Sequence, residues 1–576
     1  MRTTVPGLRP PAASAAATIL FAGRPVDCLD GDTVAAALVA AGELVCRIAP
    51  DGGPRGVFCG MGVCHDCVVV VDGAPVRSCM TRARDGMVVE VQPATPALRS
   101  RAPVRLEPVV LAPDVLVVGT GPGGLAAAAA AAEAGAQVVL VDERPKPGGQ
   151  YFKQPSDAFD VDESALDAQY RAGRELIRRA ERAGVAFEQG AQIWGASSAQ
   201  ELLAVAEGRA LALRPRRLVL ATGAYERGVP LPGWTLPGFM ATGAAQTLMR
   251  AYQVLPGRHV LVSGNGPLNV QVAAELVRAG ASVVALCEVA RAGTPARGAH
   301  VARMVVAAPD LMRQGVNYLR TLRRARVPIL YGHSVVRAEG TERVERAVVA
   351  RLDGDGRALP GTERAFEVDA VCVGFGFLPS NELARTLGVE HVYDHALGQL
   401  VAVRHGAGRS SVEHVWVVGD GGGTGGARLA QAVGELAGAD VAGSLGFSAP
   451  RSRRAERARR RNERFQRSLA ALYAAPRLVD QLADAETLVC RCEGVTLGAV
   501  DAAFVRGTAS IGAVKRTTRA GMGRCQGRYC APVLAEIAAR RSESPLDEEA
   551  WFAPAPPFKP LPVDVIAAAT AALGPD

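Results

Sequence analysis

Hydrophobic residues in this chain fall into short, branched runs separated by glycine turns and alanine-rich stretches. One such run, 114–118, precedes a glycine-rich turn and an alanine-rich segment, 125–134, whose composition favours a helix. A second apolar run, 137–141, follows and stops at two acidic residues. The same order recurs later, with runs at 259–263 and 282–286 around a helical segment. The pattern therefore predicts a multidomain α/β protein containing two strand-helix-strand units.

The first unit carries a dinucleotide-binding motif. Gly119, Gly121 and Gly124 occupy the G-x-G-x-x-G positions, with Pro122 between them. These glycines allow a tight turn, close approach of the backbone to a pyrophosphate, and close packing of helix on strand. Asp142 lies 23 residues past Gly119, where a carboxylate can bind ribose hydroxyls, so FAD or NAD is favoured over NADP. A chance glycine turn before an alanine-rich helix is the alternative.

The second unit is less regular. Gly264 and Gly266 begin its motif and Glu288 ends its second strand, but Asn269 stands where a third glycine or alanine is usual. Three interpretations remain open for this site: bound NAD, an adenine nucleotide held statically, or a vestigial domain.

Composition narrows the function classes. The chain has 576 residues, 49% of them apolar, which is enough for several domains. Its net charge of +8 comes largely from an arginine-rich run, 451–467, with interspersed acids, which predicts a solvated helical linker and not a nucleic-acid site. A partner-docking or membrane-surface role for that run is the alternative. We expect no transmembrane segment and no signal peptide, and therefore a cytoplasmic location, peripheral to the inner membrane only through partners.

Eight of the 12 cysteines form two groups, and in a cytoplasmic protein such groups indicate metal or redox chemistry. The first group has the spacing C-x4-C-x2-C with a fourth cysteine 12 positions on, which is typical of a plant-type 2Fe-2S loop. The second has one C-x-C pair and, after 32 residues, one C-x4-C pair. Zinc is the alternative for both groups. The predicted metal ligands are Cys59, Cys64, Cys67, Cys79, Cys490, Cys492, Cys525 and Cys530.

The segment 54–64, Pro-Arg-Gly-Val-Phe-Cys-Gly-Met-Gly-Val-Cys, resembles the ferredoxin-type small subunit of the hydrogen cyanide synthase and opine oxidase group. That resemblance covers about residues 19–91 and implies a β-grasp fold. The second cysteine group resembles the small helical 2Fe-2S module of bacterioferritin-associated ferredoxins. From residue 114 to 530 the chain resembles the flavoprotein subunit of the same group, which includes D-hydroxyproline dehydrogenase, and the N-terminal half of the sarcosine oxidase alpha subunit.

Three further segments resemble elements that two-dinucleotide flavoproteins share: Pro-Gly-Gly-Gln at 147–150, Ala-Thr-Gly at 221–223, and Val-Gly-Asp at 418–420. The resemblance implies FAD in the first site. Besides the motif residues already named, the residues expected to bind cofactor are Glu143, Gly149, Gln150, Thr222, Gly223, Gly419 and Asp420.

The expected organisation is a flexible tail (1–17), a ferredoxin-type domain (18–105), a Rossmann-like FAD domain (106–450) with an inserted nucleotide domain (about 225–375), an arginine-rich helical linker (451–485), a 2Fe-2S domain (486–541) and a second tail (542–576). A flavin flanked by two one-electron centres is suited to splitting electron pairs.

The resemblance implies an electron-transfer subunit of an amine or imino-acid dehydrogenase or oxidase (sarcosine, proline, hydroxyproline, opine or glycine type). It also implies, as partner, a D-amino-acid-oxidase-like FAD subunit, a quinone or other carrier as acceptor, and FMN at a subunit interface in related complexes. A self-contained NAD(P)H:acceptor oxidoreductase is the alternative, and a cluster that only clamps domains together is a third hypothesis. The sequence assigns no catalytic residue.

Overall fold

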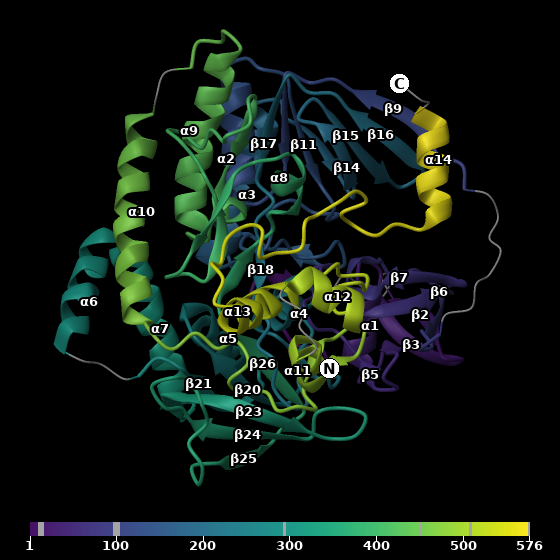
Figure 1. Cartoon of the computed structure of the whole chain (residues 1–576). Helices are drawn as coiled ribbons and strands as arrows, with labels where there is room; N and C mark the ends of the chain where they lie inside the picture. Colours follow the sequence, from purple (N-terminus) through teal and green to yellow (C-terminus); the bar gives the residue numbers. More distant parts are fainter. Residues whose placement is uncertain (10–15, 96–103, 292–294, 450–451, 506–509, 574–576) are drawn as a thin grey trace.

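The computed structural model describes residues 1–9, 16–95, 104–291, 295–449, 452–505 and 510–573. Two nucleotide-binding domains form the body, a small sheet domain packs on one side, and the segment from residue 453 to 573 runs back over them (Figure 1). No helix in these described ranges has an apolar stretch long enough to cross a bilayer.

The N-terminal domain is a mixed five-stranded sheet with one helix, α1 (Val34–Ala41), and this is the expected β-grasp arrangement. Thr33 caps α1 by accepting a hydrogen bond from the Ala36 amide, and six of the eight helix residues are buried. In sheet order the strands are β3 (Arg24–Leu29), β2 (Ala16–Phe21), β8 (Val88–Val91), β6 (Val68–Val71) and β7 (Ala74–Arg77). The short pair β4 (Arg47–Ile48) and β5 (Pro54–Arg55) precedes the first cysteine group, whose last member, Cys79, lies in a short 3-10 helix (Ser78–Met80).

The first nucleotide-binding domain has a five-stranded parallel sheet whose three central strands are mostly buried runs rich in Val and Leu. Its helix α2 (Pro122–Glu133) packs closely on α9 (Ala427–Ser444) because both carry small residues: a Cβ on Gly434 would lie 2.1 Å from the Gly123 carbonyl oxygen. In sheet order the strands are β13 (Ala186–Gln189), β11 (Val138–Asp142), β10 (Val115–Val118), β17 (Arg217–Leu220) and β30 (Val415–Val417).

Smaller elements surround this sheet. A four-stranded sheet contains β14 (Gln192–Ser198), β15 (Glu201–Ala206), β16 (Arg209–Leu213) and β9 (Glu107–Leu111). The remaining elements are α3 (Ala168–Arg182), β18 (Ala224–Glu226), β27 (Phe377–Pro379), α8 (Glu382–Thr386), β28 (His391–Asp394), β29 (Gln399–Ala402) and the turn Gly419–Gly422.

The inserted domain repeats the plan with a second parallel sheet. Its strands are β19 (Phe239–Ala241), β26 (Ala370–Gly374), β20 (His259–Gly264), β21 (Ser282–Glu288) and β22 (Ile329–Tyr331). Its helices are α4 (Thr242–Tyr252), α5 (Pro267–Arg278), α6 (Pro295–Ala307) and α7 (Pro309–Arg324), and a small sheet adds β23 (His333–Glu339), β24 (Arg346–Arg351) and β25 (Arg364–Glu367).

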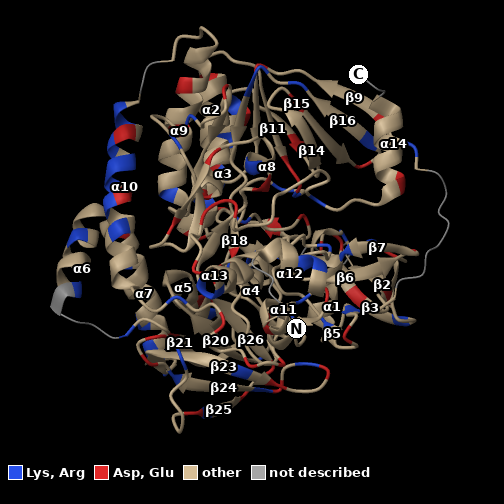
Figure 2. Cartoon of the chain, in the orientation of Figure 1, with Lys and Arg blue, Asp and Glu red and all other residues tan. Residues whose placement is uncertain are grey.

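The predicted arginine-rich helix is present as α10 (Arg453–Leu472), and its charged face is visible in Figure 2. Its other face is not solvated: Phe465 packs against Met304 and Ala307 of α6. The C-terminal domain then consists of β31 (Leu488–Cys490), β32 (Val495–Thr496), α11 (Leu497–Val505), α12 (Ile511–Thr518) and α13 (Ala531–Ser542).

Both predicted tails differ from the expectation. Near the N-terminus, β1 (Leu8–Arg9) pairs with β12 (Asp160–Val161), and Leu8 is buried, because an apolar side chain here meets a cluster around Phe159 and Leu166. Residues 10–15 of that predicted tail lie outside the described ranges. At the other end, α14 (Val563–Leu573) packs on β16 and β9.

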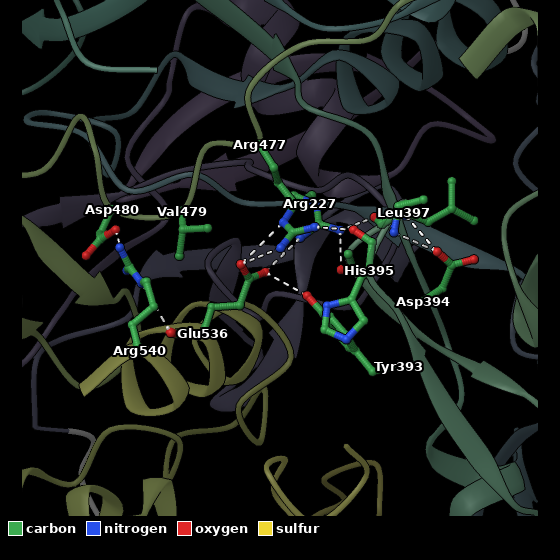
Figure 3. Close-up of polar contacts among 12 residues, drawn as sticks. Arg227, Tyr393, Asp394, His395, Leu397, Arg477, Val479, Asp480, Glu536 and Arg540 are labelled. Carbon is green, nitrogen blue, oxygen red and sulfur yellow. Dashed lines mark hydrogen bonds and ion pairs between the residues drawn. The ribbon is translucent and has the colours of Figure 1, made fainter. Parts of the chain in front are cut away.

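A polar network fixes the C-terminal domain to the first nucleotide-binding domain (Figure 3). Glu536 on α13 accepts hydrogen bonds from Tyr393 at 3.2 Å and from Arg477 at 2.9 Å, and Arg227 lies 3.9 Å away. Arg227 also donates to the carbonyl of Gly398 at 2.6 Å. The buried Glu536 carboxylate thus links α13 to three other segments: β28 through Tyr393, the segment after α10 through Arg477, and the residue after β18 through Arg227.

Candidate functional site

One continuous cavity of about 1240 Å³ lies between the two nucleotide-binding domains. It is lined by most of the residues predicted to bind FAD, by Gly266 of the second motif, and by four residues of the first cysteine loop. Arg528 of the second cysteine group also lines it. The predicted residues in its wall are Gly119, Gly121, Pro122, Asp142, Glu143, Gly149, Gln150, Thr222, Gly223, Gly266, Gly419 and Asp420, whereas Gly124, Gly264 and Glu288 lie behind the wall.

The glycines of the first motif fit a dinucleotide. A Cβ on Gly124 would lie 1.8 Å from the Gly119 carbonyl oxygen, and one on Gly119 would lie 2.3 Å from the Ala221 carbonyl oxygen. A Cβ on Gly121, by contrast, would meet no protein atom within 4 Å. The space beside Gly121 therefore lies at the N-terminus of α2, where free N–H groups and the helix dipole favour a phosphate.

The two acidic residues after β11 have different surroundings. Both carboxylate oxygens of Asp142 accept hydrogen bonds from nearby loop residues. One oxygen accepts from the amide and the hydroxyl of Thr120 at 2.7 Å, and the other accepts from the Arg144 amide at 2.9 Å. Glu143 faces Lys559, whose Nζ lies 2.8 Å away. Burial alone would raise the pKa of Glu143, but Lys559 and Arg77 lower it to about 2. Glu143 is therefore an ionised group in the cavity wall.

Sequence reasoning did not identify two buried titratable residues that line the cavity, Lys153 and Glu226. Lys153 donates to the side-chain oxygen of Gln246 at 3.0 Å, and Glu226 accepts from the Gly243 amide at 2.9 Å. Burial lowers the pKa of Lys153 to about 7 and raises the pKa of Glu226 to about 7. The only available signal was position, since both lie shortly after flavin motifs.

Replacing Glu226 with glutamine should remove a pH dependence of stability. The folded state holds the Glu226 proton up to about pH 7, whereas the unfolded chain releases it near pH 4.5, so this residue lowers stability as pH rises between those values. Relative to the native chain, we expect E226Q to gain about 2 kcal/mol of unfolding free energy between pH 5 and pH 8. Urea unfolding at both pH values measures it. The exposed Glu207→Gln variant is the control, and an equal response of the two variants would contradict the prediction.

The four cysteines of the first group gather beneath the cavity. All are buried except Cys79, which is partly exposed. The Cys64 amide donates to the Cys59 sulfur at 3.4 Å, and the Asp66 amide donates to the Cys64 sulfur at 3.4 Å. Although burial raises it, the pKa of Cys59 falls to about 6 because Cys64 and nearby backbone N–H groups stabilise its thiolate. Thiolates with N–H donors around them fit an iron-sulfur cluster.

The second group is equally compact. The sulfur of Cys492 lies 3.8 Å from that of Cys490 and 3.6 Å from that of Cys525. Contacts with Cys492 and Cys530 lower the pKa of Cys490 to about 3. These sulfurs lie close together in the folded chain, and four thiolates are the donor set of a 2Fe-2S centre.

The second nucleotide motif is arranged differently from the first. Glu288 is buried, and its oxygens accept hydrogen bonds from the amides of Gly266 at 3.2 Å and Ala290 at 3.3 Å. Burial raises the pKa of Glu288 to about 8. Asn269 is accommodated because it donates to the Gly374 carbonyl at 2.8 Å and accepts from Thr242 at 2.9 Å. Glu288 therefore braces the loop from behind the cavity wall.

Comparison with known proteins agrees with this domain order. A model of the pyridine nucleotide-disulphide oxidoreductases matches residues 113–442, one of 2Fe-2S iron-sulfur cluster binding domains matches 14–94, and one of BFD-like [2Fe-2S] binding domains matches 488–540. The A subunit of an opine oxidase from Rhizobium meliloti is 35% identical over 79% of this chain and 98% of its own length. The chain belongs to the family of opine oxidase A subunits. It is accordingly an oxidoreductase with an FAD-type domain and two 2Fe-2S domains.

Two further relatives and one solved structure are also similar to this chain. A hydrogen cyanide synthase subunit HcnB from Pseudomonas aeruginosa is 33% identical over 78% of this chain and 97% of its own length. The alpha subunit of a sarcosine oxidase from Corynebacterium sp. is 29% identical over 66% of this chain but only 38% of its own. The L-proline dehydrogenase of P. horikoshii shares the fold, with a TM-score of 0.69 at 21% identity over 97% of this chain and 99% of that one.

Proposed function

We propose that this chain is the electron-transfer subunit of a heteromeric dehydrogenase or oxidase that acts on the C–N bond of an amine or imino acid. The observation that carries the proposal is the shared cavity: residues of the flavin motifs and residues of both cysteine loops border the same space. Bound FAD accepts electron pairs and releases single electrons, and each 2Fe-2S centre carries one. Relatives named as subunits of opine oxidase and sarcosine oxidase support the substrate class.

In this proposal, some residues of the chain bind the cofactor and others form the cavity wall beside the first cysteine group. Gly121 and the N-terminus of α2 would bind the pyrophosphate, and Glu143 is placed to accept a ribose hydroxyl. Met61 and His65 of the first cysteine loop line the same cavity. Burial and the nearby Arg77 lower the pKa of His65 to about 3, so its imidazole is neutral at the cavity wall.

The partner in this proposal is a D-amino-acid-oxidase-like FAD subunit that carries the substrate site, with a quinone or another carrier as final acceptor. FMN at the subunit interface belongs to the same proposal. The test is to express this chain alone and together with the polypeptide that co-purifies with it, and to assay both with imino acids and an artificial electron acceptor. We expect turnover only in the complex. Fast turnover by the isolated chain would contradict the proposal.

NADH should reduce the flavin slowly or not at all. The carboxylate of Glu288 is occupied by backbone amides, and the residue before the second motif glycine, Asn265, donates to the carbonyl of Tyr473 at 2.9 Å, which places the end of α10 over that motif. Anaerobic mixing with NADH and NADPH, followed by flavin absorbance, measures this, with dithionite as the positive control. Rapid bleaching by either nucleotide would favour a self-contained NAD(P)H:acceptor oxidoreductase.

A further inference from the structure

Two residues inside the cysteine motifs contact each other directly. Asp66 lies between Cys64 and Cys67 of the first group, and Arg491 lies between Cys490 and Cys492 of the second. The Nε of Arg491 donates to a carboxylate oxygen of Asp66 at 2.6 Å. The side chain of Asp66 is 0% exposed and that of Arg491 is 4% exposed. The two metal-binding loops, 425 residues apart in the chain, are thus joined by one buried ion pair.

Other groups hold this ion pair in place. Arg47 pairs with the second oxygen of Asp66 at 2.9 Å. The guanidinium of Arg491 lies 3.8 Å from the ring centre of Phe58 and 4.6 Å from that of Trp234. Aromatic faces on a cation, and two cations on one carboxylate, offset the cost of burying these charges.

The loops meet a second time through the residues beside their cysteines. Phe58 precedes Cys59, Tyr529 precedes Cys530, and their rings contact edge to face with centres 5.3 Å apart. On the first loop, Asp66 also donates its amide to the Cys64 sulfur at 3.4 Å. Asp66 therefore touches a sulfur of one site with its backbone and the loop of the other site with its side chain.

We propose that the Asp66–Arg491 ion pair couples the two clusters electrostatically, so that each residue sets the reduction potential of the cluster in the opposite loop as well as its own. Both are positioning residues, because the proposed cluster ligands are the cysteines and neither the carboxylate nor the guanidinium binds a cluster. The physical reason is burial: a charge shielded from solvent acts over several ångströms at low effective dielectric, whereas an exposed charge is screened.

The sign of each effect follows from charge. Reduction adds one negative charge to a cluster, so a nearby cation favours the reduced form and a nearby anion disfavours it. Arg491→Gln should lower the reduction equilibrium constant of both clusters about tenfold, which is about 59 mV for a one-electron couple. Asp66→Asn leaves Arg491 and Arg47 without their anion and should raise both constants by a similar factor. The double variant should return both close to the native values.

The experiment is a dithionite titration of the full purified chain, followed by electron paramagnetic resonance of each reduced cluster. Signals are assigned with Cys67→Ser and Cys525→Ser, which each remove a ligand of one site. The inference depends on two resident clusters in the proposed electron-transfer subunit, but the titration needs no partner. A failure of the coupling is therefore distinguishable from a failure of the partner assay.

Two controls separate charge from structure. Arg491→Lys keeps the cation and should shift neither constant more than about threefold. Arg519→Gln removes an arginine from the same domain whose side chain is 68% exposed, and should shift neither. Opposite signs for Arg491→Gln and Asp66→Asn in both clusters would support the proposal. Shifts confined to the mutated loop, equal signs, or loss of iron from every variant would overturn it and leave the pair as a structural clamp.

Discussion

An alanine at Gly121 should abolish FAD retention while leaving the fold intact. The backbone of Gly121 has φ −71°, which any residue adopts, and the added methyl group would meet no protein atom within 4 Å. It would instead project into the cavity at the N-terminus of α2, where the pyrophosphate must approach the backbone. Losing that approach should cost about 3 kcal/mol or more, which is at least about a hundredfold in FAD affinity.

Flavin absorbance per chain and reconstitution of the apoprotein with FAD measure this effect, and circular dichroism reports the fold. Gly124→Ala is the matched comparison: its methyl group would lie 1.8 Å from the Gly119 carbonyl oxygen, so this variant should lose stability and not only affinity. Native FAD affinity in Gly121→Ala would show that the dinucleotide does not use this helix terminus.

Removing residues 546–576 should release FAD and destabilise the C-terminal domain. Phe558 is buried, and Phe558, Lys559 and Pro560 form part of the cavity wall. Phe552 covers Gly521 and Gly527 beside the second cysteine group, where a Cβ on Gly521 would lie 2.2 Å from its ring. Removing one buried phenylalanine side chain costs about 3–5 kcal/mol of stability. The deletion should therefore reduce both flavin and iron content.

Two point variants distinguish the loss of flavin from the loss of iron. Lys559→Met removes only the cation beside Glu143, so the pKa of Glu143 should rise from about 2 and FAD should dissociate more readily at mildly acidic pH, with iron content unchanged. Val563→Ala changes a residue that is 82% exposed and should alter neither cofactor. Full flavin and iron in the deleted chain would contradict a role for this segment.

The sequence predicted those elements whose backbone conformation depends mainly on the residues within the element. The helix expected at 125–134 and both motif turns were predictable because alanine favours a helix and glycine permits the positive φ angles of the turns. The sequence also led us to expect Cys490, Cys492, Cys525 and Cys530 close together, because one 2Fe-2S cluster requires four thiolates. The sulfurs of Cys492 and Cys525 lie 3.6 Å apart.

Contacts between distant segments were not predictable in the same way. Phe558 follows a proline-rich stretch with no hydrophobic periodicity, so nothing in the sequence indicated that its side chain is buried or that its amide donates to the Trp194 carbonyl. Likewise, the spacing of the cysteines does not indicate that Asp66 and Arg491 form an ion pair, because that contact depends on how two domains dock. The pKa values of Lys153 and Glu226 are shifted mainly by burial in the folded chain, which the sequence alone does not reveal.

The first cysteine loop is wedged against the inserted nucleotide domain. The Ala241 amide donates to the Phe58 carbonyl at 2.9 Å, and Gly60, with φ +60°, is so close to Ala244 that a Cβ would lie 3.0 Å from its Cα. Covalent fusion therefore holds the ferredoxin-type domain at a permanently high effective concentration beside the flavin domain. If the chain is the electron-transfer subunit proposed above, dilution should leave the rate of electron transfer between these two domains unchanged, unlike a step that depends on a diffusing carrier protein.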